Sequence, residues 1–182
     1  MSQEPPSTER PRGDVDVVVI DEQADHELDT DRWARLAAAT LESQGVTRGE
    51  LTITFVDEVT ITALNLEHMG GDGPTDVLSF PLDHDGDVDG FEADPSVPSL
   101  LGDVVVCPTV AAANAAAHAT ESSEPHPGHP GHDGSVESEI DLLVVHGVLH
   151  LLGHDHAEDD ERDRMQAAER AVLAGPDRAV QP

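Results

Sequence analysis

The amino-acid sequence predicts a fold of mixed α and β structure, with about four β-strands and about five helices in one domain. Short runs of β-branched residues alternate along the chain with longer segments whose apolar residues recur at helical spacing. The 182 residues fit one domain. Only 37% of them are hydrophobic, so the core has to come from these segments. We expect one domain over residues 14–174, a disordered N-terminal tail over 1–13 and a C-terminal tail over 175–182.

Four segments are typical of β-strands. The first is a run of β-branched residues, and in the second Leu51, Ile53 and Phe55 alternate with threonines. Such alternation predicts a strand with one buried face. The four expected strands cover residues 15–20, 51–55, 77–82 and 104–107.

Five segments are typical of helices. The first begins at a capping residue, Asp29 or Thr30, and ends at Gly45. The five expected helices cover residues 29–45, 57–68, 109–120, 140–152 and 158–174. In the second helix we expect three apolar side chains to face inward: Val59, Ala63 and Leu66. In the last helix a similar stripe is formed by Met165, Ala168 and Val172.

Residues 83–99 are rich in Asp, Gly and Pro, which predicts a loop. Its aspartates alternate as in a calcium-binding EF-hand loop, at Asp83, Asp85, Asp87 and Asp89. The required glycine and the distal glutamate are out of register, and Asp94 stands at the twelfth position. The pattern therefore favours a solvated acidic loop over a specific calcium site.

Residues 121–135 form a second unusual segment, rich in His, Pro and Gly. His126, His129 and His132 recur every three residues. A histidine-rich tract can bind metal, but a frame of Pro and Gly imposes no fixed geometry on the three rings. The composition therefore favours a mobile insertion.

The charge of the chain excludes several classes of function. The 38 acidic residues outnumber nine basic ones, all arginine, and the net charge is −29. Such a chain repels anionic surfaces, which argues against a sequence-independent nucleic-acid coat, a DNA partner or an anionic membrane. No apolar run approaches the roughly 18 residues of a membrane helix. The N-terminus does not resemble a signal peptide, and a single cysteine precludes an internal disulfide, so we expect a cytoplasmic protein.

The segment 146–156 carries the clearest chemical signal. His146 and His150 are four residues apart and share one face of a helix. Gly153 can leave the helix in a left-handed conformation, so that His156 returns to the same point as a third ligand. Three neutral imidazoles with an open fourth position are typical of catalytic zinc, which lowers the pKa of its bound water to about 7. We therefore predict one Zn²⁺ at these three histidines and expect zinc-bound water to carry out the proton chemistry.

The spacing of the histidines equals that of the metzincin proteases, with one difference. The glutamate that serves those enzymes as general base is Gly147 here. Glycine cannot move a proton, so efficient peptide hydrolysis is not expected. Phosphodiesters fit better, because a metal stabilises charge on phosphoryl oxygens and the 2′-hydroxyl of RNA is a built-in nucleophile. We assign no protein side chain as general base and no substrate-binding residue.

The roles of two other residues of this segment stay open. Asp155 either orients a ligand histidine or caps the turn. His154 is better suited to a substrate-side or surface position than to a fourth metal ligand.

Other polar residues are open in the same way. Thr75, Asp76 and Ser79 either line the groove beside the metal or have structural roles in the turn and the sheet. Cys107 ends an apolar strand, so we expect a buried, inert thiol.

Three blocks of this sequence, in order, resemble the YbeY family of bacterial single-strand-specific endoribonucleases. Residues 74–81 (PTDVLSFP) resemble the family's P-T-[ND]-V-L-S-F-P block, and residues 101–106 (LGDVVV) resemble its L-G-D-I-x-I strand. Residues 146–156 (HGVLHLLGHDH) resemble its zinc motif, H-G-x-L-H-L-x-G-Y-D-H. The resemblance runs from about residue 50 to residue 173.

The resemblance implies an α+β fold in which a small mixed sheet packs with helices and zinc lies at the end of a groove. It also implies His146, His150 and His156 as ligands and single-stranded ribosomal RNA as substrate. The family acts in rRNA maturation, so ribosomal proteins or 30S particles are the partners to expect.

The chain departs from the family pattern at three places. Met69 stands where the family usually has a basic residue, and His154 replaces the usual tyrosine. The histidine-rich stretch before Ile140 is an insertion. Because no Arg or Lys occurs between Arg48 and Arg162, a charge clamp for phosphate is missing from the expected place.

Two other functions therefore stay open. The first is a ribosome-maturation binding protein in which the metal is structural; Met69 favours it and the open three-histidine site disfavours it. The second is a metalloprotease, against which Gly147 argues.

Overall fold

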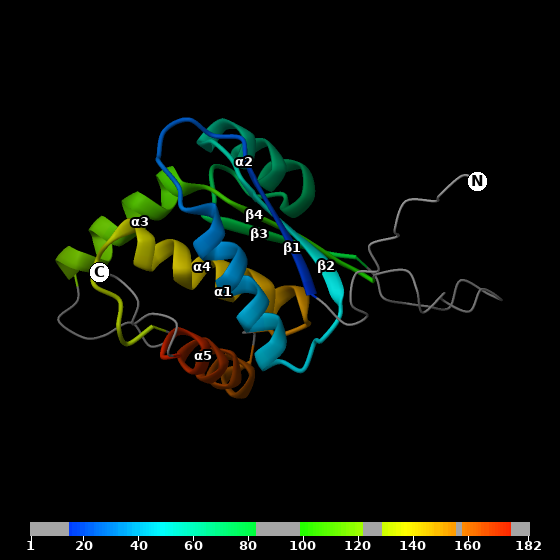
Figure 1. Cartoon of the computed structure of the whole chain (residues 1–182). Helices are drawn as coiled ribbons and strands as arrows, with labels where there is room; N and C mark the ends of the chain where they lie inside the picture. The colour runs from blue at the N-terminus through cyan, green and yellow to red at the C-terminus, as the bar shows by residue number, and fades with distance from the viewer. Residues whose placement is uncertain (1–14, 83–98, 122–128, 156–157, 176–182) are drawn as a thin grey trace, which may run out of the picture.

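The computed structural model describes residues 15–82, 99–121, 129–155 and 158–175. It is an α+β fold, as the sequence predicts, and Figure 1 shows helices packed around one sheet. The predicted N-terminal tail, the aspartates of the acidic loop and residues 176–182 lie outside the described residues. His126 and His156 lie outside them too.

The sheet is small and mixed. Its strands are β1 (Val15–Asp21), β2 (Gly49–Phe55), β3 (Val77–Pro81) and β4 (Leu100–Val106), and their spatial order is β1-β2-β4-β3. β1, β2 and β4 run parallel, and β3 pairs antiparallel with β4 at the edge. The β4 strand starts four residues before the predicted strand, because its pairing with β2 continues past an irregularity between Glu50 and Leu51.

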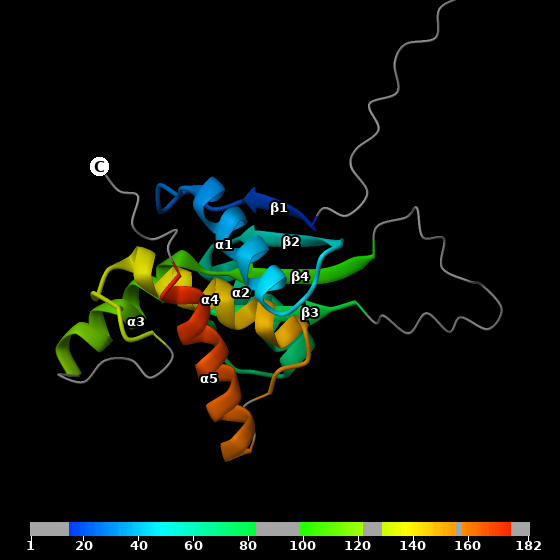
Figure 2. The ribbon, with the colours of Figure 1, turned by 60° about the horizontal axis from the view of Figure 1, so that its bottom comes forward.

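The helices form layers on the sheet. They are α1 (Thr30–Ser43), α2 (Glu58–Leu64), α3 (Pro108–Glu121), α4 (Val136–Leu151) and α5 (Asp159–Leu173), with a π-helical turn, η1 (Asn65–Met69), after α2. α1 and α4 lie side by side on the sheet, and α5 packs on α4 (Figure 2). The main core lies between the sheet, α1 and α4, where Trp33 and Phe55 are fully buried.

The second predicted helix differs from the prediction in two ways. It divides into α2 and η1, and the expected inward stripe is wrong: Val59 is 78% exposed, Leu66 is 59% exposed, and Ala63 is exposed. Ile61 is buried instead, with Leu64 beside it, in a cluster that includes residues of β3 and β4. The segment is so short that apolar periodicity alone does not define which side meets the sheet.

α4 is the central helix of the molecule. It begins at Val136, four residues before the predicted start, because Ser135 caps it by accepting a hydrogen bond from the Ser138 amide. One face packs on the sheet, and the opposite side packs on α5. Between Ser138 and Leu151 every residue is buried except His146 and His150. The fold thus leaves open only the stripe of α4 that carries the two histidines.

Candidate functional site

The structure brings His146 and His150 together on α4. Their Nε2 atoms are 3.1 Å apart and their ring centroids 4.6 Å apart. The spacing of four residues places both rings on one face of the helix. The third histidine of the predicted set, His156, lies outside the described residues.

Gly153 ends the helix in the way that its position predicts. Its φ is +84°, its amide donates to the His150 carbonyl, and the His154 amide donates to the Leu149 carbonyl. This pair of bonds is the Schellman motif, which favours glycine in the left-handed conformation. The chain therefore turns sharply just after His150.

Glu169 on α5 is a site residue that the sequence analysis missed. Its Oε1 atom lies 2.8 Å from Nδ1 of His146, and its side chain is only 4% exposed. An ionised carboxylate only accepts hydrogen bonds, so Nδ1 carries the proton and Nε2 presents a lone pair. The sequence did contain a sign that Glu169 is buried. Glu169 follows Met165 by four residues, so it lies on the apolar stripe of α5.

Gly147 lies where α4 approaches the sheet most closely. A Cβ atom built on it would lie 2.7 Å from Cγ1 of Val104 on β4, and the Ser79 hydroxyl on β3 donates to its carbonyl at 2.9 Å. Any side chain at this position would force Val104 or the helix itself to move. The protease general base is therefore absent for a packing reason as well as a sequence reason.

Two cavities adjoin at the histidines. One has a volume of about 390 Å³ and is lined by His118, Glu139, Arg162 and Glu169, among others. The other, of about 420 Å³, is lined by Met69, Thr75, Ser79 and His150, among others. Both cavities share Asp76, Val77 and His146. The two cavities therefore meet at His146, and together they are called the groove below.

Asp76 lines the groove but is held by its neighbours. Its Oδ2 accepts from the Asn114 amide at 2.9 Å, and its Oδ1 accepts from the Val77 backbone amide at 2.9 Å. These bonds give Asp76 a structural role at the start of β3.

His154, one of the two residues of the segment whose role stayed open, contacts α1. The His154 Nε2 atom lies 3.0 Å from Oε1 of Gln44, at the end of α1. Asp155 is exposed. The carboxylate that orients a histidine of the motif is Glu169.

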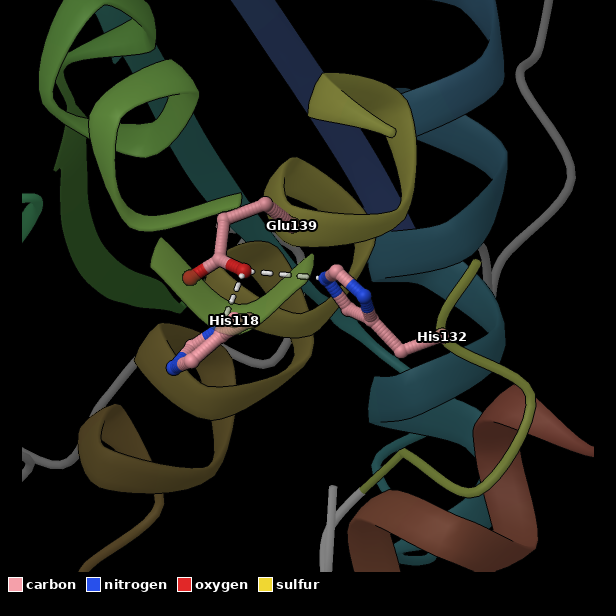
Figure 3. A group of neighbouring side chains, drawn as sticks. All are labelled: His118, His132 and Glu139. Atoms are coloured by element: carbon pink, nitrogen blue, oxygen red, sulfur yellow. Dashed lines mark hydrogen bonds and ion pairs between the residues drawn. The ribbon is translucent and has the colours of Figure 1, made fainter. Parts of the chain in front are cut away.

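A second cluster of metal-ligating side chains lies beside the cavity that contains His146, and Figure 3 shows its three members. It consists of His118 on α3, His132 before α4 and Glu139 on α4, whose ligand atoms all lie within 4.8 Å of one another. These three side chains are able to hold a metal ion. Of the histidine-rich insertion that the sequence predicts, the structure describes residues 129–135, where His129 is 1% exposed and the His132 side chain 5% exposed.

Comparison with known proteins identifies the family. A family model described as Endoribonuclease YbeY matches residues 18–176. The chain belongs to the YbeY endoribonuclease family. It is 41% identical over 164 residues to an endoribonuclease YbeY of Salinispora tropica, with 86% of this chain and 94% of that protein covered. It is 42% identical over 156 residues to one of Thermobifida fusca, with 84% of this chain and 89% of that protein covered.

A solved structure shares the fold. The solution structure of a protein from Thermotoga maritima matches with a TM-score of 0.51 at 24% identity, covering 91% of this chain and 97% of that one. The YbeY family match begins at residue 18, within β1, well before residue 50, where the resemblance in the sequence begins. It therefore includes most of β1, the other three strands and the helices that the structure describes.

Met69 is the departure from the YbeY pattern that matters most for the groove. Its side chain is 55% exposed and lies on the wall of the cavity that also contains His150. Arg162 lines the other cavity, from α5. Met69 thus puts an apolar group in one cavity, where the sequence resemblance implies a basic residue, and Arg162 puts a guanidinium in the other.

Cys107 is buried, as the sequence predicts, with no exposed surface. Burial raises the pKa of its thiol, so the neutral, unreactive form predominates at neutral pH. Among the helices of the described residues, none has the length and apolar composition needed to cross a membrane.

Proposed function

We propose that this chain is a zinc-dependent endoribonuclease that cleaves single-stranded ribosomal RNA during ribosome maturation in the cytoplasm. His146, His150 and His156 would hold the zinc. The observation that carries the proposal is the convergence of two Nε2 atoms, 3.1 Å apart, at the centre of a groove. Membership of an endoribonuclease family supports RNA as the substrate.

The described residues fit a zinc ion. Two ligand atoms of a tetrahedral zinc lie about 3.3 Å apart, given metal–nitrogen distances of about 2.0–2.1 Å. The observed separation of the two Nε2 atoms is within a few tenths of an ångström of this value. Glu169 fixes the tautomer of His146 that has its lone pair directed into the groove.

The chain's own residues position the reaction. A zinc ion would supply Lewis acidity toward the phosphodiester, and the 2′-hydroxyl of RNA would supply the nucleophile. Glu169 orients His146, and the bond from Ser79 to the Gly147 carbonyl fixes α4 against β3. Arg162 lines the cavity that contains His146, and its guanidinium is ion-paired with the exposed Asp159. We propose that an RNA phosphate competes with Asp159 for this guanidinium.

A cleavage assay tests the proposal. Zinc-loaded protein is incubated with a labelled single-stranded rRNA fragment across a salt series, beside the His150→Ala variant. We expect cleavage by the native chain and none by the variant, with both retaining the same circular dichroism spectrum. His26→Gln, a histidine substitution outside the groove, should cleave normally.

A second function has one observation in its favour. Met69 in place of a basic residue suits a ribosome-maturation factor that binds without cutting, with the metal in a structural role. In that case the zinc-loaded chain leaves RNA intact at every salt concentration, and His150→Ala lowers the melting temperature because metal binding then contributes to folding. A protease is disfavoured by the packing of Gly147 and would cleave unstructured peptides instead of RNA.

A further inference from the structure

Three segments of the chain meet at the cluster formed by His118, His132 and Glu139. His118 comes from α3, His132 from the connection that precedes α4, and Glu139 from the first turn of α4 (Figure 3). Oε2 of Glu139 lies 3.1 Å from Nδ1 of His118 and 2.9 Å from Nε2 of His132. The two imidazole rings are perpendicular, with centroids 5.9 Å apart. The ligand atoms of all three side chains therefore converge.

The donor set and the spacing suit a metal ion. Two histidines and one glutamate also hold zinc in several metallopeptidases. Ligand atoms on a tetrahedral zinc are about 3.3 Å apart, so the two distances to Glu139 need to lengthen by only a few tenths of an ångström. The His118 side chain is 44% exposed, which leaves room for that adjustment.

The burial of Glu139 is a second reason to expect a metal ion at this cluster. Its side chain is 3% exposed, and a buried carboxylate is costly unless a positive group neutralises it. A neutral imidazole donates a hydrogen bond to a carboxylate but adds no positive charge. A divalent ion would neutralise the carboxylate at neutral pH. The net charge of −29 also raises the local concentration of cations around the chain.

We propose that His118, His132 and Glu139 form a second metal site, which takes one divalent ion of the zinc type. Its remaining coordination position opens into the groove, because His118 and Glu139 line the same cavity as His146. An ion here ties α3 and the connection before α4 to the first turn of α4.

The site is separate from the metal site proposed at His146. Glu139 and His146 are seven residues apart on one face of α4, which corresponds to about 10 Å along the helix axis. Ions of a two-metal catalytic centre lie about 3.5–4 Å apart. The second ion would therefore stabilise the packing of α3 against α4 and add positive charge to the groove. It would not share a reacting atom with the first ion.

Ion binding has a local consequence that can be observed. Without an ion, the Gly134 amide donates to Nδ1 of His132 at 3.1 Å, so a neutral ring carries its proton on Nε2, directed at Glu139. An ion bound to Nε2 moves that proton to Nδ1. The Gly134 amide then loses its acceptor, and its resonance in an amide NMR spectrum should shift.

Metal stoichiometry tests the proposal. Untagged protein is dialysed against Zn²⁺, and the bound ion is counted by elemental analysis. We expect two ions per chain in the native protein and one in His118→Gln, which changes the most exposed of the three ligands. Glu139→Gln and His132→Gln should also bind one ion, whereas His26→Gln and Glu137→Gln, the matched controls, should bind two. Folding of each variant is verified by circular dichroism.

The two proposed sites fail in distinguishable ways. If the site at His146 and His150 is absent, His150→Ala leaves the count unchanged while His118→Gln reduces it to zero. The second-site proposal is overturned if His118→Gln binds as many ions as the native chain. It is also overturned if the Gly134 amide resonance moves equally in the native chain and in His118→Gln during the zinc titration.

Discussion

At the scale of single residues, two side chains of α5 contribute to the groove. Glu169 is almost fully buried and bonds to Nδ1 of His146, which makes it a positioning residue for the proposed zinc. Partners of this kind that orient a metal ligand typically account for a factor of 10 to 100 in metal affinity. Arg162, seven residues earlier on the same helix, lines the same cavity.

Glu169→Gln should weaken zinc binding at His146 by about 10- to 100-fold, because an amide oxygen accepts less strongly than a carboxylate from the imidazole N–H. The measurement is competition with a chromogenic chelator, made in a His118→Gln background so that the second cluster does not contribute. Glu161→Gln on the same helix is the control and should leave the affinity unchanged. An equal affinity in the Glu169→Gln variant would show that the bond to His146 has no role in metal binding.

Arg162→Gln should raise the KM for single-stranded RNA about tenfold and leave kcat nearly unchanged, because the guanidinium is expected to bind phosphate away from the reacting atoms. Steady-state cleavage at fixed salt measures both constants. Arg164→Gln, an exposed arginine two residues further on, is the matched control. If the two variants have the same KM, Arg162 does not contact the substrate.

At the scale of elements, α4 determines where the histidines lie. Its start is fixed by Asp133, whose Oδ1 accepts from the Ser135 hydroxyl and from the Ser138 hydroxyl, the latter at 2.7 Å. Its middle is fixed by Gly147, which lets the helix lie close to β4. A substitution of Asp133 or Gly147 should therefore lower the stability of the fold, and should affect His146 and His150 only by that route.

Stability should depend on pH through Asp133. Hydrogen bonds from the Ser135 and Ser138 hydroxyls, followed by the Ser135 amide, hold the pKa of Asp133 well below its ordinary value. The stabilisation is therefore complete above about pH 5, where the carboxyl is ionised even in the unfolded chain, and is lost as the pH falls toward the folded-state pKa. Asp133→Asn should cost about 1 kcal/mol at pH 7 and less below pH 3. Urea unfolding from pH 7 to pH 2.5 measures this, with the exposed Asp160→Asn as the control.

Gly147→Ala should destabilise the fold by about 1–3 kcal/mol, because the added methyl group would lie 2.7 Å from Val104 Cγ1. Urea denaturation provides the measurement. In the background of Val104→Ala the same substitution should cost much less, since the smaller side chain leaves room for the new Cβ. Strictly additive effects of the two substitutions would contradict the packing argument.

At the scale of the whole molecule, charge opposes the proposed substrate. The chain carries −29 and RNA is a polyanion, so their long-range interaction is repulsive. At 0.1 M salt the Debye length is about 10 Å, so the repulsion between charges further apart than this is largely screened. Local contacts in the groove act over shorter distances and are screened less.

We therefore expect kcat/KM for a single-stranded oligonucleotide to rise between about 0.05 M and about 0.3 M salt, opposite to the fall that is usual for nucleic-acid-binding proteins. Initial cleavage rates at low substrate concentration measure this slope. A dinucleotide with a single phosphate is the control and should show almost no slope. A fall in kcat/KM with salt for the longer substrate would mean that local positive contacts outweigh the net charge.

The sequence by itself determined the features that depend on neighbouring residues. The alternation in 51–55 predicted β2, and the spacing of His146, His150 and Gly153 predicted a shared helix face followed by a left-handed turn. The geometry of a strand or a helix repeats within a few residues, so such patterns can be read locally. The three motif blocks also identified the family and, with it, the α+β class.

Only the tertiary structure decided which distant residues meet. Glu169 reaches His146 across the interface of α5 with α4, and His118 and Glu139 meet because α3 packs on α4. The inward side of α2 was mispredicted for the same reason, since contact with β3 and β4 chose Ile61 rather than Val59. These pairings are set by how whole elements pack, and the side-chain periodicity of one element carries no information about its partner.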